Sequence, residues 1–232
     1  MKQKMVKKAK EVIKKFSKEY GLKYNSKWLQ CIFLPYEECL IKKFLSGDPL
    51  DNYNFEKSIK RFKNLNKFIK SDFFKWMNKG KRGQGGLTRI DKFKTEKKEI
   101  NKIKDTKLKK KVKSIYEKIE KKFKDEYIVI LPKTGSYNLQ ILTHEWMHVL
   151  LNKNPTINKK ERGYDWFNEG LATLSEYIVS DKIDKIKKDI KKKGLSKVRY
   201  MYLKYALKWK EKLEKSKERK RVIEKTFKTR KF

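Results

Sequence analysis

The chain contains little of several residue types, and each scarcity narrows what the protein can be. Its 232 residues include two cysteines, Cys31 and Cys39, which are too few for a disulfide framework and favour a reduced, intracellular setting. No apolar run approaches the length that crosses a bilayer. Residues 1–20 also lack the continuous apolar core of a secretion signal. We therefore expect a cytoplasmic protein without a transmembrane segment.

Acidic residues are also scarce, at 28 against 65 lysines and arginines, and the formal net charge is +37. A net charge of this size is typical of proteins that bind nucleic acid or another polyanion. The basic residues are mostly lysine, however, and they are spread along almost every segment. Specific recognition of phosphates and bases relies more on arginine. A solvated basic surface is therefore the favoured interpretation, and weak polyanion binding is the alternative.

The chain has two histidines, and both lie in one motif, T-H-E-W-M-H-V-L, at residues 143–150. On a helix His144 and His148 share one face, so they can bind a single metal ion. Glu145 is placed to deprotonate a metal-bound water. Apolar residues surround the motif on nearly every side of the helix, which predicts that it is buried and that unpaired imidazoles would be costly there. The alternative is a pair of hydrogen-bonded core histidines in a chance pattern.

A second segment, W-F-N-E-G-L-A at residues 166–172, supplies a carboxylate, Glu169. A catalytic zinc takes three protein ligands and keeps one open position for water. A third histidine does not exist in the chain, which excludes the metzincins, and the inverted motif H-x-x-E-H is absent. The sequence therefore predicts one zinc ion bound by His144, His148 and Glu169, with Glu145 as the general base.

Together the two segments resemble the gluzincin branch of the zinc metallopeptidases, in the MA clan, and more loosely the minigluzincins. The resemblance covers roughly residues 127–180. It implies a helix-rich α+β domain of zincin type, with a small sheet, the H-E-x-x-H helix and a glutamate helix. It also implies hydrolysis of a peptide or protein substrate by a zinc-activated water.

The resemblance further implies a tyrosine or histidine that stabilises the oxyanion. Since neither histidine is available, the candidates are Tyr177, Tyr200, Tyr202 and Tyr205. In thermolysin-like members an aspartate one turn after the ligand glutamate supports a ligand histidine, and the corresponding residue here is Thr173. Thr173 itself, Asp165, Glu176 or a backbone carbonyl could take that role.

The remaining sequence is mostly helical in pattern. Apolar residues spaced by three and four predict helices within 1–20, 55–80, 108–123 and 197–213. Residues 127–131 predict a strand, which resembles the strand at the rim of the gluzincin cleft. A peptide substrate could pair with that strand, and the alternative is a central strand with both edges filled.

A basic, glycine-rich stretch at residues 80–86 predicts a loop or hinge. We therefore expect an N-terminal helical region at 1–80, a hinge at 81–92, a catalytic region at 93–213 and a charged tail at 214–232. The tail is expected to be a solvated or frayed helix.

The function predicted from these features is that of a zinc metallopeptidase. One alternative is a latent or inactive zinc-binding protein of zincin fold, in which a segment within residues 1–80 covers the cleft instead of completing the fold. The other is a basic nucleic-acid-binding protein built on the same scaffold.

Overall fold

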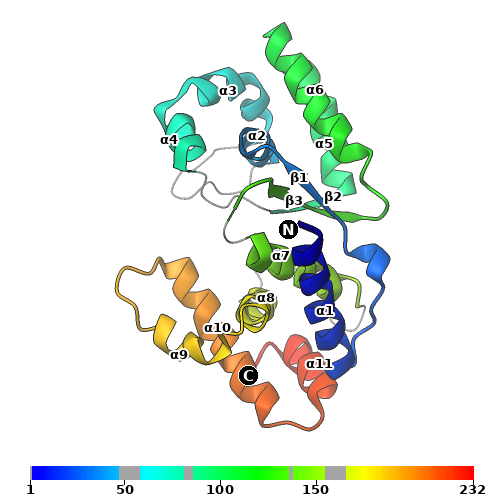
Figure 1. The fold of residues 1–232 in the computed structure, drawn as a ribbon, viewed down its shortest axis with the longest axis vertical. Helices are drawn as coiled ribbons and strands as arrows, with labels where there is room; N and C mark the ends of the chain where they lie inside the picture. The colour runs from blue at the N-terminus through cyan, green and yellow to red at the C-terminus, as the bar shows by residue number, and fades with distance from the viewer. Residues whose placement is uncertain (1, 47–57, 81–85, 136–137, 155–165) are drawn as a thin grey trace. The chain divides into compact units, whose positions relative to one another are not determined.

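The structure is a computed structural model, and it describes residues 2–46, 58–80, 86–135, 138–154 and 166–232 (Figure 1). The chain forms two compact units. Unit 1 combines residues 1–29 with 139–232, and unit 2 consists of residues 30–138. This division differs from the boundaries expected at residues 80 and 93. Residues 81–85 of the expected hinge lie outside the described part. None of the described helices is both long and apolar enough to span a membrane.

The regular elements in the described part of unit 1 are all helices. Its helices are α1 (Lys2–Glu19), α7 (Asn138–Asn152), α8 (Trp166–Val179), α9 (Ile186–Asp189), α10 (Lys197–Glu214) and α11 (Arg219–Thr229), with short 3₁₀ helices at Ser26–Trp28 and Ile183–Lys185. Figure 1 shows α1, in dark blue, in the same unit as the C-terminal helices in yellow to red. The first helix therefore folds with chain that follows it by more than a hundred residues.

Helix α1 follows the apolar stripe expected from its sequence. Ala9, Ile13 and Phe16 are buried, and the chain turns at Gly21, which has a φ of 63°. A positive φ is readily adopted only by glycine, so the helix ends where the sequence predicted. Because α1 packs on α8 within unit 1, residues 1–29 are part of the fold of that unit. This packing favours the interpretation that they complete the fold.

Helices α8 and α10 pack closely against each other over much of their length. Gly170 allows this close approach. A Cβ atom at position 170 would lie 2.6 Å from Cβ of Tyr205, on α10. The indole nitrogen of Trp209, also on α10, donates a hydrogen bond of 2.8 Å to the carbonyl of Phe167. These contacts hold the first turn of α8, and hence Glu169, against α10.

The C-terminal segment differs from the expected solvated tail. Residues 219–229 form α11, which buries Ile223 and Phe227. The ring of Phe227 stacks on Trp209 with centroids 5.7 Å apart. The segment is helical, as one of the two expected forms, but it is only partly solvated, because its sparse apolar residues lie on one helical face and that face packs on α10.

Unit 2 combines helices with a sheet. Its elements are β1 (Cys31–Leu34), α2 (Tyr36–Ser46), α3 (Ser58–Lys70), α4 (Asp72–Gly80), β2 (Gly86–Arg89), α5 (Ile90–Glu99), α6 (Thr106–Glu120) and β3 (Tyr127–Pro132), with a 3₁₀ helix at Ile100–Lys102. Helix α2 packs against the other helices of the unit and against β3. The helix expected over residues 55–80 is two helices, because the Ser71 hydroxyl accepts a hydrogen bond from the Phe74 amide and caps α4.

The expected strand at residues 127–131 is present as β3, but it lies in the middle of the sheet. The strand order is β1-β3-β2, with β1 parallel and β2 antiparallel to β3 (Figure 1). All six residues of β3 are buried. Pairing of a substrate strand with β3 is therefore excluded, and the alternative of a central strand with both edges filled is correct. Hydropathy identifies a buried strand but does not reveal its neighbours.

A buried ion pair joins three helices of unit 2. Nζ of Lys42, on α2, lies 2.7 Å from Oε2 of Glu96, on α5, and the two side chains are 2% and 8% exposed. The hydroxyl of Tyr116, on α6, donates a hydrogen bond of 2.8 Å to the same carboxylate oxygen. Burial of two charges is tolerated here because each compensates the other.

Candidate metal centre

The two histidines project from α7, the helix that the H-E-x-x-H motif predicted. Leu142, Trp146 and Met147 are fully buried, so the helix is held in place on several sides. The side chains of His144 and His148 are only 12% and 14% exposed. Their spacing of four residues places both imidazoles on one face, and their Nε2 atoms are 3.0 Å apart.

Glu169 meets the two imidazoles from the first turn of α8. Its Oε2 lies 3.3 Å from Nε2 of His144, and its Oε1 lies 3.6 Å from Nε2 of His148. One potential ligand atom from each of the three residues lies within 4.8 Å of the other two. The structure thus brings together the three residues that the sequence predicted as metal ligands.

The other ring nitrogens of the histidines are held by oxygen acceptors. Nδ1 of His144 lies 2.6 Å from Oε1 of Glu176, and Nδ1 of His148 lies 2.6 Å from Oδ1 of Asn168. A carboxylate or an amide oxygen can only accept, so both Nδ1 atoms must carry the proton. In a neutral imidazole this tautomer directs the Nε2 lone pair toward the shared point. Partners of this kind orient the metal-binding histidines of known sites.

Among the candidates that the sequence left for supporting a ligand histidine, Glu176 is the one that contacts His144. The hydroxyl of Thr173 is buried and has no hydrogen-bond partner within the described residues. Asp165 lies outside them. Glu176 stands seven residues, or two helical turns, after Glu169, so it shares the face of α8 that meets α7. One turn separates Thr173 from Glu169, but its short side chain does not make the contact with His144.

Two further residues of the site were not found from the sequence. Asn168 immediately precedes the ligand glutamate in the W-F-N-E-G phrase, and that position was its only signal. Nη2 of Arg199, at the start of α10, lies 3.3 Å from Oε2 of Glu176. Nothing in the sequence relates Arg199 to a carboxylate 23 residues away on another helix, so this contact is visible only in the fold.

The electrostatics of the cluster favour a positive charge between its donors. Burial lowers the pKa of His144, but the carboxylates of Glu169 and Glu176 outweigh burial and raise that pKa to about 10. Burial raises the pKa of Glu169, and the two imidazoles more than offset this effect and hold it below its usual range. The carboxylates are thus held ionised around a point where a cation is stabilised.

Among the four tyrosine candidates, Tyr202 lies beside the cluster. Its ring centroid is 6.2 Å from that of His144, and burial, followed by the charge of Glu145, raises its pKa to about 12. The Tyr177 hydroxyl donates to Asp189 at 2.8 Å, and Tyr205 packs against Phe167. Tyr200 is 42% exposed. Of the four candidates, Tyr202 is therefore the one that the structure places beside His144.

The three donor atoms are spaced so that they could hold one metal ion. Ligands about 2.1 Å from a tetrahedral ion are about 3.4 Å from each other. The three Nε2 and carboxylate separations are 3.0, 3.3 and 3.6 Å. Oε2 of Glu169 is buried and has no hydrogen-bond partner within the described residues, which an ion bound to it would compensate.

Comparisons of the chain with protein-family models, with curated protein sequences and with solved structures found no match. The assignment of a function therefore depends on the motifs and on the geometry of the cluster.

Proposed function

We propose that the chain is a zinc-dependent metallopeptidase of gluzincin type. The observation that supports the proposal best is the convergence of His144, His148 and Glu169, with both Nδ1 atoms already engaged. Two imidazoles and one carboxylate are the ligands of a catalytic zinc with an open position. When bound, zinc would polarise a peptide carbonyl and lower the pKa of water.

In the proposed reaction each neighbouring residue has a separate role. Glu145 directly follows His144 on α7, and its carboxylate takes a proton from the attacking water and passes it to the leaving amine. Glu176 and Asn168 hold the two imidazoles in orientation through their Nδ1 protons. The Tyr202 hydroxyl donates a hydrogen bond to the carbonyl oxygen as negative charge develops on it.

Metal analysis combined with a cleavage assay tests the proposal. The purified chain should contain about one zinc per molecule and cleave an unstructured protein such as casein. The variant His148→Ala should lose zinc. The variant Glu145→Gln should keep zinc and lose about 10²- to 10⁴-fold in cleavage rate, because it keeps the shape of the side chain but cannot take the proton.

A matched control is Glu117→Gln, which makes the same change at an exposed position of α6 in unit 2. This variant should keep both zinc and activity. Cleavage by Glu145→Gln at the rate of the unchanged chain would show that the proposed general base is wrong. A chain that binds zinc through the three ligands but cleaves no peptide would favour the inactive zinc-binding alternative.

A further inference from the structure

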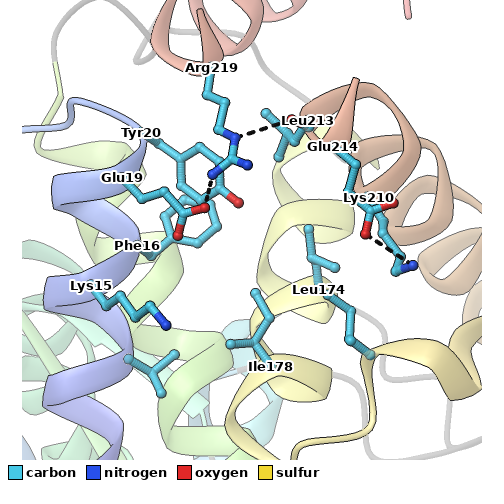
Figure 2. Close-up of a pocket in the computed structure, with 12 residues that line it drawn as sticks. Lys15, Phe16, Glu19, Tyr20, Leu174, Ile178, Lys210, Leu213, Glu214 and Arg219 are labelled. Carbon is cyan, nitrogen blue, oxygen red and sulfur yellow. Dashed lines mark hydrogen bonds and ion pairs between the residues drawn. The ribbon is translucent and has the colours of Figure 1, made fainter. Parts of the chain in front are cut away.

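A pocket lies in unit 1, on the side of α8 that faces away from Glu169. The pocket has a volume of about 290 Å³ and is enclosed by α1, α8 and α10 (Figure 2). Leu174 and Ile178 of α8 form part of its wall. They are rotated by about 140° and 180° around the helix from Glu169. The pocket is therefore separate from the metal centre, although the same helix contributes to both.

The walls of the pocket are largely apolar. They include Val12 and Phe16 from α1, Leu174 and Ile178 from α8, and Leu213 from α10. An apolar cavity of about 150 Å³ holds a benzene molecule, so this volume admits a ligand of about 12 non-hydrogen atoms. Small-molecule sites are of this kind, mostly apolar with a few polar groups that fix the ligand. The ligand should accordingly have an apolar body.

Most charged groups around the pocket are already paired. Arg219 extends from α11 over one end, where it forms an ion pair with Glu19 and donates a hydrogen bond of 3.2 Å to the carbonyl of Leu213 (Figure 2). Nζ of Lys210 lies 3.1 Å from Oε1 of Glu214. These two ion pairs compensate the charges of four of the lining residues.

Two polar groups are the exceptions, one on α1 and one directly after it. Lys15 has no hydrogen bond or ion pair within the described residues, and the hydroxyl of Tyr20 makes no hydrogen bond within them either. Tyr20 as a whole is only 7% exposed, but its hydroxyl oxygen is not fully buried and is open to water or to a ligand. Burial, followed by the charge of Glu214, raises the pKa of Tyr20 to about 12, which keeps the phenol protonated and able to donate.

We propose that this pocket binds an unbranched aliphatic monocarboxylate of about ten carbons, the carboxyl carbon included. The carboxylate accepts hydrogen bonds from the Lys15 ammonium and the Tyr20 hydroxyl, and the tail lies along Leu174 and Ile178. Lys15 is exposed, and its flexible stem can bring the ammonium over the opening. The pocket is lined by three cationic and two anionic side chains, so it has an excess of one positive charge. The single negative charge of the ligand would compensate that excess. The inference does not depend on the proposed peptidase activity.

Calorimetric titration of the whole chain with decanoate at physiological salt tests the proposal. The expected result is one saturable site per chain, with decanol, which has the same tail without the charge, binding at least fivefold more weakly. Lys15→Met and Tyr20→Phe should each weaken decanoate binding by about fivefold. Lys14→Met removes an exposed lysine next to the site on the same helix and should leave binding unchanged.

The location is tested by filling the pocket. Ile178→Trp should abolish decanoate binding while circular dichroism shows a folded chain. If that variant does not fold, Lys15→Glu tests the location instead. It reverses the charge of an exposed side chain without changing the core. This variant should reduce decanoate binding further than Lys15→Met does. Equal affinity for decanoate and decanol would overturn the carboxylate assignment. Unchanged binding in the folded Ile178→Trp variant, or in Lys15→Glu, would overturn the site.

Discussion

The close approach of α8 and α10 at Gly170 leads to a prediction about both stability and the metal centre. In Gly170→Ala the new Cβ would lie 2.6 Å from Cβ of Tyr205, 2.9 Å from its backbone carbonyl carbon and 3.0 Å from Cδ1 of Trp209. Two of these three atoms belong to the backbone or to the first side-chain carbon. They cannot be moved by rotating a side chain, so the helices themselves must separate.

The size of the effect follows from these distances. Non-bonded carbon atoms prefer separations of about 3.5–4.0 Å, so the shortest contact falls about 1 Å below the preferred range. Overpacking of this kind costs about 1–3 kcal/mol. Alanine recovers about 1 kcal/mol because it favours a helix over glycine. We expect a net loss of about 1 kcal/mol, which corresponds to a fall of roughly 3 °C in Tm for a chain of this size.

The proposed metal centre should respond more strongly than the overall stability. Glu169 directly precedes Gly170, so a displacement of the first turn of α8 moves the third ligand away from the imidazoles of α7. A fall of about tenfold in zinc affinity is expected, comparable to the loss of a group that orients a ligand. Thermal unfolding followed by circular dichroism and competition with a zinc-binding dye measure the two effects.

Gly86→Ala is the matched control for this prediction. Gly86 lies in β2, and a Cβ atom there would meet nothing within 4 Å. The same substitution should therefore leave both Tm and zinc affinity nearly unchanged. If Gly170→Ala behaves like Gly86→Ala in both assays, the close packing of α8 on α10 does not position Glu169, and the reasoning is refuted.

Three further predictions follow from single contacts. Lys42→Met should lower the free energy of unfolding by about 3 kcal/mol, because it leaves the buried Glu96 carboxylate without its counter-ion. Replacing both residues by methionine should recover most of that loss in urea unfolding, and a double variant as unstable as the single one would contradict the argument. Glu176→Gln should weaken zinc binding by about tenfold, measured by the same dye competition, because a neutral amide holds the imidazole proton less strongly. Tyr202→Phe should lower kcat by about 10²-fold with little change in KM, whereas Tyr200→Phe, at an exposed position, should have no effect, and equal losses in both variants would remove the proposed role.

Features that depend on a short stretch of chain were predictable from the sequence. The apolar spacing around α1, α6 and α10 specified helices, and the continuous apolar run at 127–131 specified a strand. The H-E-x-x-H spacing placed His144 and His148 on one face of α7. These features were accessible because a helix or strand imposes its own period on the residues that face the core.

Contacts between segments that lie far apart in the sequence became visible only in the tertiary structure. The sequence left four candidates for the support of a ligand histidine, and the packing of α8 on α7 selected Glu176 over Thr173. It left four tyrosines open, and the packing of α10 placed Tyr202 beside His144. Periodicity shows which face of an element is buried, but the identity of the element that covers this face depends on shape and on the path of the whole chain.

The same reason explains the differences in overall organisation. Residues 1–29 were expected in an N-terminal region, but α1 folds with the C-terminal helices, and β3 lies between β1 and β2 rather than at an edge. The charged segment 219–229 buries Phe227 because α10 presents Trp209 to it. The sequence by itself thus determined most of the elements and which residues of one helix share a face. The tertiary structure determined how they meet, because each such contact joins residues whose separation along the chain leaves no local pattern.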